Sequence, residues 1–212
     1  MPLNKLEAFK LIELLNKSIK KPKTSLKYRN KFTLLTSVLL SAQCTDVNVN
    51  NVTKNIYKKY YMPKHFVNLG IPKIKRMIKN LGLFNVKAKN LYNLSKILVK
   101  KYKEKIPNNF TDLINLPGVG QKTANVVLNV AFNKPTIAVD THVFRVSNRT
   151  GLAINKNPFK VEEQLLKVLP NKYIKKAHHL ILLHGRYICK SRRPLCKKCI
   201  IKKICLYKNK NV

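Results

Sequence analysis

The segment Leu116–Ala124 reads Leu-Pro-Gly-Val-Gly-Gln-Lys-Thr-Ala and predicts a tight turn between two helices. Apolar residues at 113, 114 and 116 close a short helical pattern, and a longer apolar pattern begins at Ala124. Pro117 cannot continue the first helix, whereas Gly118 and Gly120 allow positive φ and, without a Cβ, permit another backbone to approach closely. The chain is therefore organised around a helix, a two-glycine turn and a second helix.

The start of that second helix predicts an anion-binding site, because its first N–H groups have no partners within the helix. The chain carries 44 Lys and Arg against 8 Asp and Glu, a net charge of +36, so we expect the anion to be a nucleic-acid phosphate at Gly118 and Gly120. Lysine outnumbers arginine 37 to 7, as AT-rich coding would also produce. The position of the arginines, five of which lie between Arg145 and Arg193, is therefore stronger evidence than total charge.

Lys122 and Asp140 form the candidate catalytic pair. Lys122 lies in the first turn of the second helix, where the positive end of the helix dipole disfavours a second positive charge, so its amine can act as a nucleophile toward a sugar carbon. Asp140 follows a short apolar run and precedes another helical pattern. The alternative is that Lys122 is one of many solvated lysines and Asp140 only an N-cap.

The carboxyl-terminal region predicts a metal site. Four cysteines stand in the spacing C-x6-C-x2-C-x5-C, at Cys189, Cys196, Cys199 and Cys205. From the spacing alone, one zinc ion and one iron–sulfur cluster are equally compatible, since both accept four cysteine ligands. The first residues include no apolar signal region, so we expect an intracellular protein, in which disulfides are disfavoured. Cys44 is left over and is expected to be a small core residue.

The loop between the first two of these cysteines is strongly basic. It contains Lys190, Arg192 and Arg193, so a metal centre that fixed this loop would hold it against a DNA backbone. A solvated basic loop is the alternative.

The remaining sequence predicts an all-α fold. Apolar residues recur at helical spacing in most segments, and no alternating strand pattern is present. Residues 32–42 are almost entirely apolar or small, which predicts a helix buried on most sides. No stretch reaches the roughly 18 apolar residues that a membrane span requires, so we expect a soluble cytoplasmic protein with no membrane partner.

Four motifs together resemble the endonuclease III family of the helix-hairpin-helix DNA glycosylase superfamily: Leu116–Ala124, Val139–Arg145, Leu40–Asp46 and the four cysteines. The resemblance covers nearly the whole chain. It implies two helical domains flanking a cleft: a six-helix domain at 24–133 with the helix-hairpin-helix, and an iron–sulfur cluster domain at 1–23 plus 134–212. It also implies that Lys122 and Asp140 face each other across that cleft, and that the cysteines hold one [4Fe–4S] cluster.

The same resemblance implies a bifunctional DNA glycosylase and apurinic/apyrimidinic lyase. The expected substrate is double-stranded DNA with oxidised or ring-damaged pyrimidines or abasic sites, bound by a monomer associated with the nucleoid. Gln43 and Leu83 match family positions whose side chains enter the duplex after a base is flipped out. Two rivals are a non-catalytic helix-hairpin-helix protein, with no use for Lys122, and an adenine-specific monofunctional glycosylase, which would lack that lysine.

Overall fold

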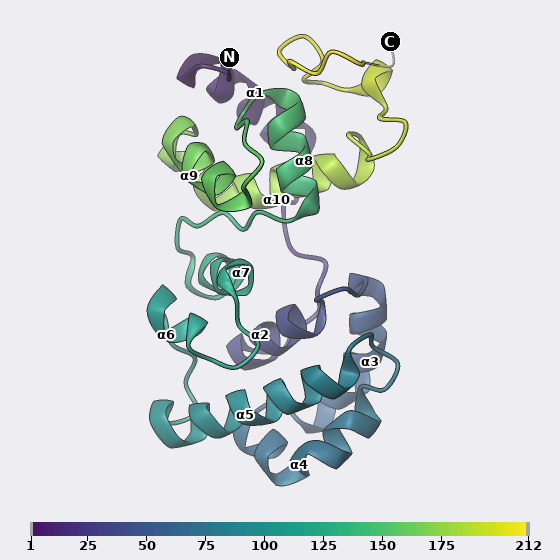
Figure 1. Ribbon diagram of the computed structural model, residues 1–212, viewed down its shortest axis with the longest axis vertical. Coiled ribbons are helices and arrows are strands. Elements are labelled where there is room, and N and C mark those ends of the chain that lie inside the picture. The colour runs from purple at the N-terminus through teal and green to yellow at the C-terminus, as the bar shows by residue number, and fades with distance from the viewer. Residues whose placement is uncertain (1, 211–212) are drawn as a thin grey trace. The chain divides into compact units, whose positions relative to one another are not determined.

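The computed structural model of the chain describes residues 2–210, and every regular element in that range is a helix (Figure 1). The predicted all-α fold is therefore confirmed. The elements are α1 (Lys5–Ser18), α2 (Lys31–Leu40), α3 (Asp46–Lys59), α4 (Pro63–Met77), α5 (Phe84–Tyr102), α6 (Phe110–Ile114), α7 (Gln121–Phe132), α8 (Thr141–Thr150), α9 (Pro158–Val168), α10 (Asn171–Tyr187) and a short 3₁₀ helix, η1 (Cys196–Lys198).

The chain divides into two compact units. The central unit is continuous, from Ser25 to Phe132, and contains α2 to α7. The terminal unit combines residues 1–24 with residues 133–212 and contains α1, α8, α9, α10 and η1.

The core of the central unit is built on α2. Nine of its ten residues are buried, as the uninterrupted apolar sequence predicts, because a helix surrounded by others has no polar face. Asn30 is the N-cap of α2: its side-chain oxygen accepts a hydrogen bond from the Thr33 N–H. The Thr33 hydroxyl oxygen in turn accepts a hydrogen bond from the Asn30 N–H. Around α2 pack α3, α5 and α7, while α4 lies against α5.

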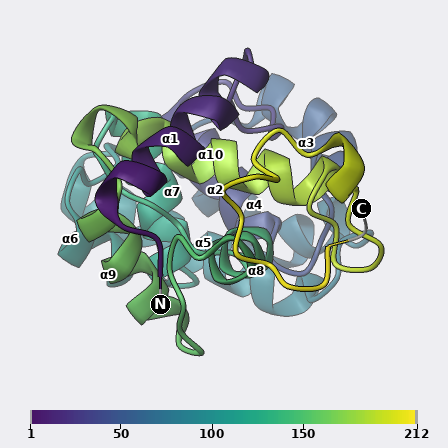
Figure 2. The ribbon, with the colours of Figure 1, turned by 90° about the horizontal axis from the view of Figure 1, so that it is seen from above.

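The terminal unit has its own apolar core between α1, α8, α9 and α10. Viewed from above, α1 crosses α10, and the carboxyl-terminal segment runs beside α8 (Figure 2). Asn4 and Glu7 form a capping box at the start of α1, and the apolar stripe of that helix is buried: Ala8, Leu11, Ile12 and Leu15. The backbone N–H of Leu3 donates to the carbonyl of Gly151 at 2.8 Å, which ties the start of the chain to the end of α8.

The helix predicted at residues 32–42 is shorter in the structure, because α2 ends at Leu40, and α4 is interrupted. Helix α4 is bent at Gly70, whose φ is +69°, and it ends at Met77. Residues 78–82 instead form turns, so Gly82 lies next to the start of α5.

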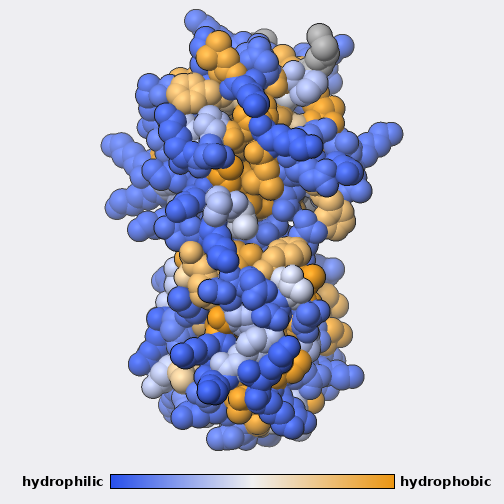
Figure 3. All heavy atoms as spheres, turned by 90° about the vertical axis from the view of Figure 1, so that its left-hand side faces the viewer, coloured by the Kyte–Doolittle hydropathy of each residue, from blue (hydrophilic) through white to orange (hydrophobic). Residues whose placement is uncertain are grey.

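Hydrophilic side chains cover most of the face drawn in Figure 3, as the net charge requires. Within the described part of the chain, no helix is both long and apolar enough to cross a membrane.

Candidate functional site

The two glycines between α6 and α7 have different roles. Gly118 has φ +78°, and a Cβ at this position would lie 2.8 Å from Nδ2 of Asn90. Gly120 is outside the positive-φ region, and a Cβ there would meet no atom within 4 Å. Of the two glycines that allow positive φ, only Gly118 adopts it. The chain reverses direction at Gly118, where the Val119 N–H donates to the Leu116 carbonyl at 3.0 Å. Gly120 instead leaves an open surface beside the start of α7.

Lys122 is the second residue of α7 and is exposed. The first backbone bond of that helix runs from the Ala124 N–H to the Gly120 carbonyl at 2.9 Å, so the glycine turn leads directly into the helix that carries the amine. On the opposite face of α7, Ala124 and Val127 are fully buried. Burial of that face fixes the direction in which Lys122 projects, away from the core of the central unit.

Asp140 is the N-cap of α8. Its Oδ1 accepts a hydrogen bond from the Val143 N–H at 2.7 Å, and the side chain is half-buried. The extended segment before it is held by His178 of α10, whose Nδ1 lies 2.8 Å from the carbonyl oxygen of Ala138. Capping engages one carboxylate oxygen, so the capping role and a role in chemistry are compatible. Lys122 belongs to the central unit and Asp140 to the terminal unit, and their pairing stays a prediction.

Two arginines of α8 hold the segment that follows α10. Arg145 donates to the carbonyls of Gly185 at 2.8 Å and Cys189 at 3.1 Å. One turn later, Arg149 donates to the carbonyls of Lys190 at 2.7 Å and Ser191 at 2.9 Å. The sequence had suggested that arginines in this region contact phosphate. These two instead bind protein backbone, and each does so with the planar donor geometry that distinguishes Arg from Lys.

The four carboxyl-terminal cysteines line one small cavity, together with apolar residues that include Pro194 and Ile201. Burial raises the pKa of the Cys199 and Cys205 thiols above the ordinary value. Within residues 2–210, no three Cys, His, Asp or Glu side chains are gathered closely enough to hold a metal ion.

The basic loop between Cys189 and Cys196 is exposed at all three candidate DNA-contacting residues, Lys190, Arg192 and Arg193. Arg193 has φ +49°, a left-handed conformation that is uncommon for a residue with a Cβ. Because Arg149 binds the carbonyls of Lys190 and Ser191, the loop backbone is anchored while its cationic side chains remain available.

Gln43 and Leu83 lie in two turns of the central unit that touch each other. Both residues have left-handed backbone, with φ +54° and +59°, and both are exposed. Gly82 lies where the turns meet, since a Cβ built there would be in ordinary van der Waals contact with the Gln43 carbonyl oxygen at 3.7 Å and with Sγ of Cys44 at 3.8 Å. The expectation that Cys44 is a core residue is wrong: α2 ends at Leu40, and the cysteine is half-buried in the turn that follows.

Lys87 is the residue of this region that sequence reasoning missed. It is 4% exposed, and its Nζ donates to Sγ of Cys44 at 3.2 Å. The signal was present in the sequence, because Lys87 extends the buried stripe of Leu91, Leu94 and Leu98 by one helical turn toward the start of α5. A lysine on the apolar face of a helix indicates a buried amine with a specific partner.

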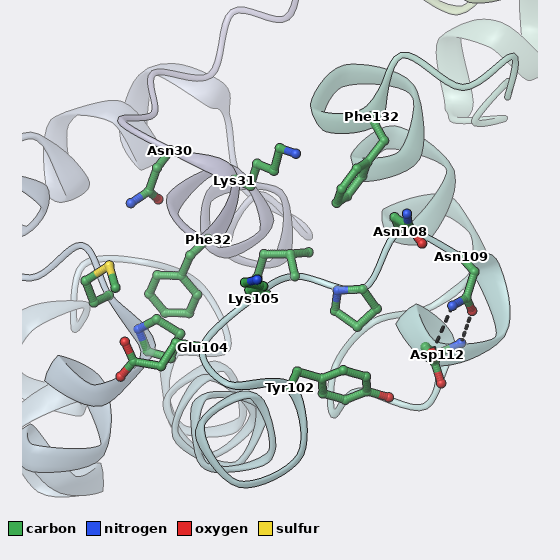
Figure 4. A pocket seen from close by; sticks show the side chains of 14 residues that line it. Asn30, Lys31, Phe32, Tyr102, Glu104, Lys105, Asn108, Asn109, Asp112 and Phe132 are labelled. Carbon is green, nitrogen blue, oxygen red and sulfur yellow. Dashed lines mark hydrogen bonds between the residues drawn. The ribbon is translucent and has the colours of Figure 1, made fainter.

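A separate open cavity of about 590 Å³ lies elsewhere in the central unit and contains none of the predicted site residues (Figure 4). Phe132, Lys31 and Tyr102 line it, and two hydrogen bonds join Asn109 to Asp112 at its rim. The bond from the Asn109 side chain, helped by Tyr102, lowers the pKa of the Asp112 carboxyl. Asn109 caps α6 by accepting the Asp112 N–H, and the Asp112 carboxylate accepts from the Asn109 side chain, so the pair serves the helix start and includes neither Lys122 nor Asp140.

Comparison with known proteins gives consistent matches along the chain. The model of the HhH-GPD superfamily of base excision DNA repair proteins matches residues 36–171. Endonuclease III of Rickettsia prowazekii (strain Madrid E) is 52% identical over 198 residues, 93% of each chain. Endonuclease III of Escherichia coli (strain K12) is 46% identical over 208 residues, 98% of this chain and 99% of its own.

Solved structures agree with these sequence matches. A trapped endonuclease III–DNA covalent intermediate is similar with a TM-score of 0.91 and 39% identity over 96% of each chain. A thermostable thymine-DNA glycosylase, 24% identical, shares the fold with a TM-score of 0.81 over 93% of this chain and 92% of its own.

Proposed function

The chain belongs to the HhH-GPD superfamily of base excision DNA repair proteins, and from this premise we infer that it is a bifunctional DNA glycosylase and abasic-site lyase of the endonuclease III type. The similarity to a trapped endonuclease III–DNA covalent intermediate carries this conclusion, because a covalent adduct requires a protein nucleophile. The exposed amine of Lys122, at the end of the glycine turn, is the group we assign to that role.

In this mechanism the Lys122 amine attacks C1′ of the damaged nucleotide, and the bond from C1′ to the base breaks. The base leaves with the bonding electron pair and a proton, and the sugar ring opens to an iminium. The iminium makes a C2′ proton acidic, so its removal drives β-elimination. The C3′–O bond then breaks and the strand is released on that side as a 5′-phosphate. Asp140 stabilises the positive charge that develops on the sugar or accepts the proton of Lys122.

The substrate we assign is duplex DNA with oxidised or ring-damaged pyrimidines, or with an abasic site, bound by one copy of the chain at the nucleoid. Gly118 and Gly120 would admit the phosphate backbone to the start of α7. Lys190, Arg192 and Arg193 would contact phosphates from the anchored loop. Gln43 and Leu83 would fill the space that the flipped base leaves in the stack.

We assign one [4Fe–4S] cluster to Cys189, Cys196, Cys199 and Cys205. Four thiols that line one cavity fit the usual ligand set of such a cluster, and a bound cation would favour the thiolate form that burial otherwise opposes. The cluster would supply ligand bonds that close the loop from Cys189 to Cys196, while Arg149 holds the same loop from outside.

Covalent trapping tests the proposed function. Incubation with a duplex that contains an abasic site, in the presence of borohydride, should link the protein to DNA through a reduced imine. Lys122→Gln should abolish the adduct while DNA binding persists, and Lys89→Gln, an exposed lysine on α5, is the matched control. An undiminished adduct in Lys122→Gln would remove Lys122 from the mechanism.

Substrate panels separate the alternatives. The proposal expects cleavage of duplexes that contain thymine glycol or an abasic site. Activity confined to adenine opposite 8-oxoguanine would instead indicate an adenine-specific glycosylase, and binding without any cleavage would indicate a non-catalytic protein.

A further inference from the structure

The buried amine of Lys87 has an unusual environment. Cys44 is its hydrogen-bonding partner, through the 3.2 Å contact from Nζ to Sγ. Among the described residues, no carboxylate lies within ion-pair distance of this amine. A thiol is a weak acceptor, and burial of a cationic group is unfavourable unless strong partners compensate it. A methionine or leucine would fill the same position on the apolar stripe of α5 without that cost, so packing alone does not explain a lysine here.

The bond from Lys87 spans the two turns that carry Gln43 and Leu83. Lys87 lies one helical turn after Leu83, and its N–H donates to the Leu83 carbonyl at 3.0 Å. Cys44 directly follows Gln43, and its N–H donates to the Ser41 carbonyl at 3.0 Å. The side-chain bond therefore connects the start of α5 to the turn after α2, 43 residues apart in sequence.

Two further contacts lie at or beside these turns. Gly82 lies beside the turn at Gln43 and Cys44, close enough that an added Cβ would be in van der Waals contact with both residues. At the outer edge, Nδ2 of Asn48 in α3 donates to the carbonyl of Asn80 at 3.1 Å. The Lys87–Cys44 bond closes the buried side of this junction, and the Asn48–Asn80 bond closes the exposed side.

The backbone of Gln43 and of Leu83 gives a reason for such bracing. Left-handed conformations are unfavourable for residues with a Cβ and persist only where surrounding contacts fix them. Two exposed side chains on two independent turns could each relax away from that conformation. Turns that are bonded to each other have to relax together.

We propose that Lys87 is a positioning residue that, through Cys44, couples the turn at residues 41–44 to the turn at residues 82–83, so that Gln43 and Leu83 enter DNA as one rigid element. This inference rests on the proposed function, in which those two side chains occupy the duplex. Lys87 would not itself contact the DNA. Its loss would impair extrusion of the base more than the chemistry at the sugar.

The test compares Lys87→Met, which keeps length and apolar packing but removes the amine, with Lys89→Met, which removes the same charge from an exposed site on the same helix. Single-turnover excision of a damaged base should fall in Lys87→Met on the order of 10- to 100-fold, the range expected from a displacement of about 1 Å. Cleavage of a preformed abasic site, which has no base to extrude, should match the Lys89→Met control. Lys87→Arg, which restores a donor, should recover part of the excision rate.

Cys44→Ala provides the second arm, because it removes the acceptor with little loss of packing. If Lys87 acts through Cys44, the double variant should lose no more excision than the more impaired single variant, which is the signature of coupled residues. Losses that multiply in the double variant would overturn the proposal. So would an equal fall in excision and abasic-site cleavage in Lys87→Met, which would indicate a general structural role.

Fluorescence of 2-aminopurine placed opposite the lesion reports how the gap in the stack is filled and requires no chemistry. Binding should change this signal in the wild-type protein and in Lys89→Met, and change it less in Lys87→Met and Cys44→Ala. A wild-type protein that excises no base would refute the proposed function, and the fluorescence comparison would still decide the role of Lys87. Equal signals in all four proteins would refute the coupling.

Discussion

Alanine at each glycine of the α6–α7 turn should separate folding from DNA binding. Gly118→Ala places a Cβ on backbone with φ +78°, 2.8 Å from Nδ2, 3.0 Å from Cβ and 3.1 Å from Cγ of Asn90. Because the Cβ of Asn90 is fixed by α5, rotation of that side chain cannot relieve the contact fully. Gly120→Ala adds a Cβ into open space on backbone outside the left-handed region. The two substitutions add the same methyl group to different environments.

The magnitudes follow from these contacts. A left-handed residue with a Cβ is unfavourable by about 1–2 kcal/mol, and overpacking against a fixed neighbour adds about 1–2 kcal/mol. The free energy of unfolding should therefore fall by about 2–4 kcal/mol in Gly118→Ala, which lowers Tm by roughly 5–15 °C in a chain of this length. Gly120→Ala should leave stability within about 0.5–1 kcal/mol of the wild type.

DNA binding should show the opposite order once loss of folded protein is taken into account. A methyl group at Gly120 would stand between the phosphate backbone and the N–H groups of α7, and loss of one charge-assisted hydrogen bond weakens binding about 10- to 100-fold. Thermal melting followed by circular dichroism measures the first effect, and fluorescence anisotropy with a labelled abasic duplex at 20 °C measures the second.

Two results would contradict this reasoning. If Gly120→Ala melted as low as Gly118→Ala, the turn geometry described above would be wrong. If Gly120→Ala bound the duplex as tightly as the wild type, no DNA backbone would approach the start of α7 at that residue.

Three further predictions address the other parts of the site. Asp140→Asn retains an oxygen that can cap α8, so the variant should fold normally while base excision falls on the order of 100-fold or more; near-normal excision would reduce Asp140 to a cap. Protein purified without oxygen should be yellow-brown and contain about four irons and four sulfides per chain, and one zinc in their place would contradict the [4Fe–4S] assignment. Burial lowers the pKa of His179 from 6.5 to about 4. Between pH 6.5 and 4, His179 is therefore protonated in the unfolded chain but neutral in the folded chain. The free energy of unfolding should decrease by up to about 3 kcal/mol as pH falls through this range. Urea titrations at several pH values measure this slope, which should flatten in His179→Gln if the histidine causes it.

The helices could be predicted from the sequence because their causes are local. Pro117 and Gly118 end one helix and reverse the chain, and the apolar spacing of α5 and α10 identifies their buried faces. The near-complete burial of α2 follows from its composition. Each of these features can be predicted from neighbouring residues alone, without information on distant parts of the chain.

The features that could not be predicted depend on contacts between distant residues. The left-handed backbone of Gln43 and Leu83 is supported by packing across Gly82, and neither residue type suggests positive φ. From the sequence, Arg149 is expected to bind phosphate. In the structure it instead donates to the backbone carbonyls of Lys190 and Ser191, about 40 positions away. Periodicity indicates that Lys87 is buried but cannot identify Cys44 as its partner.

The terminal unit is assembled from both ends of the chain, and this has a consequence for synthesis on the ribosome. The central unit is contiguous and has all its residues once Phe132 has emerged. Helix α1 packs against α10, which begins at Asn171. At a translation rate of about 5–20 residues per second, the apolar face of α1 therefore stays uncovered for roughly 10–30 s until α10 has been synthesised. The capping box at Asn4 and Glu7 is formed within the helix itself and can stabilise α1 during that interval. Helix α1 is thus translated before α8, α9 and α10 but docks only after α10 has emerged, and nascent chains stalled before α10 should expose it to proteases and chaperones.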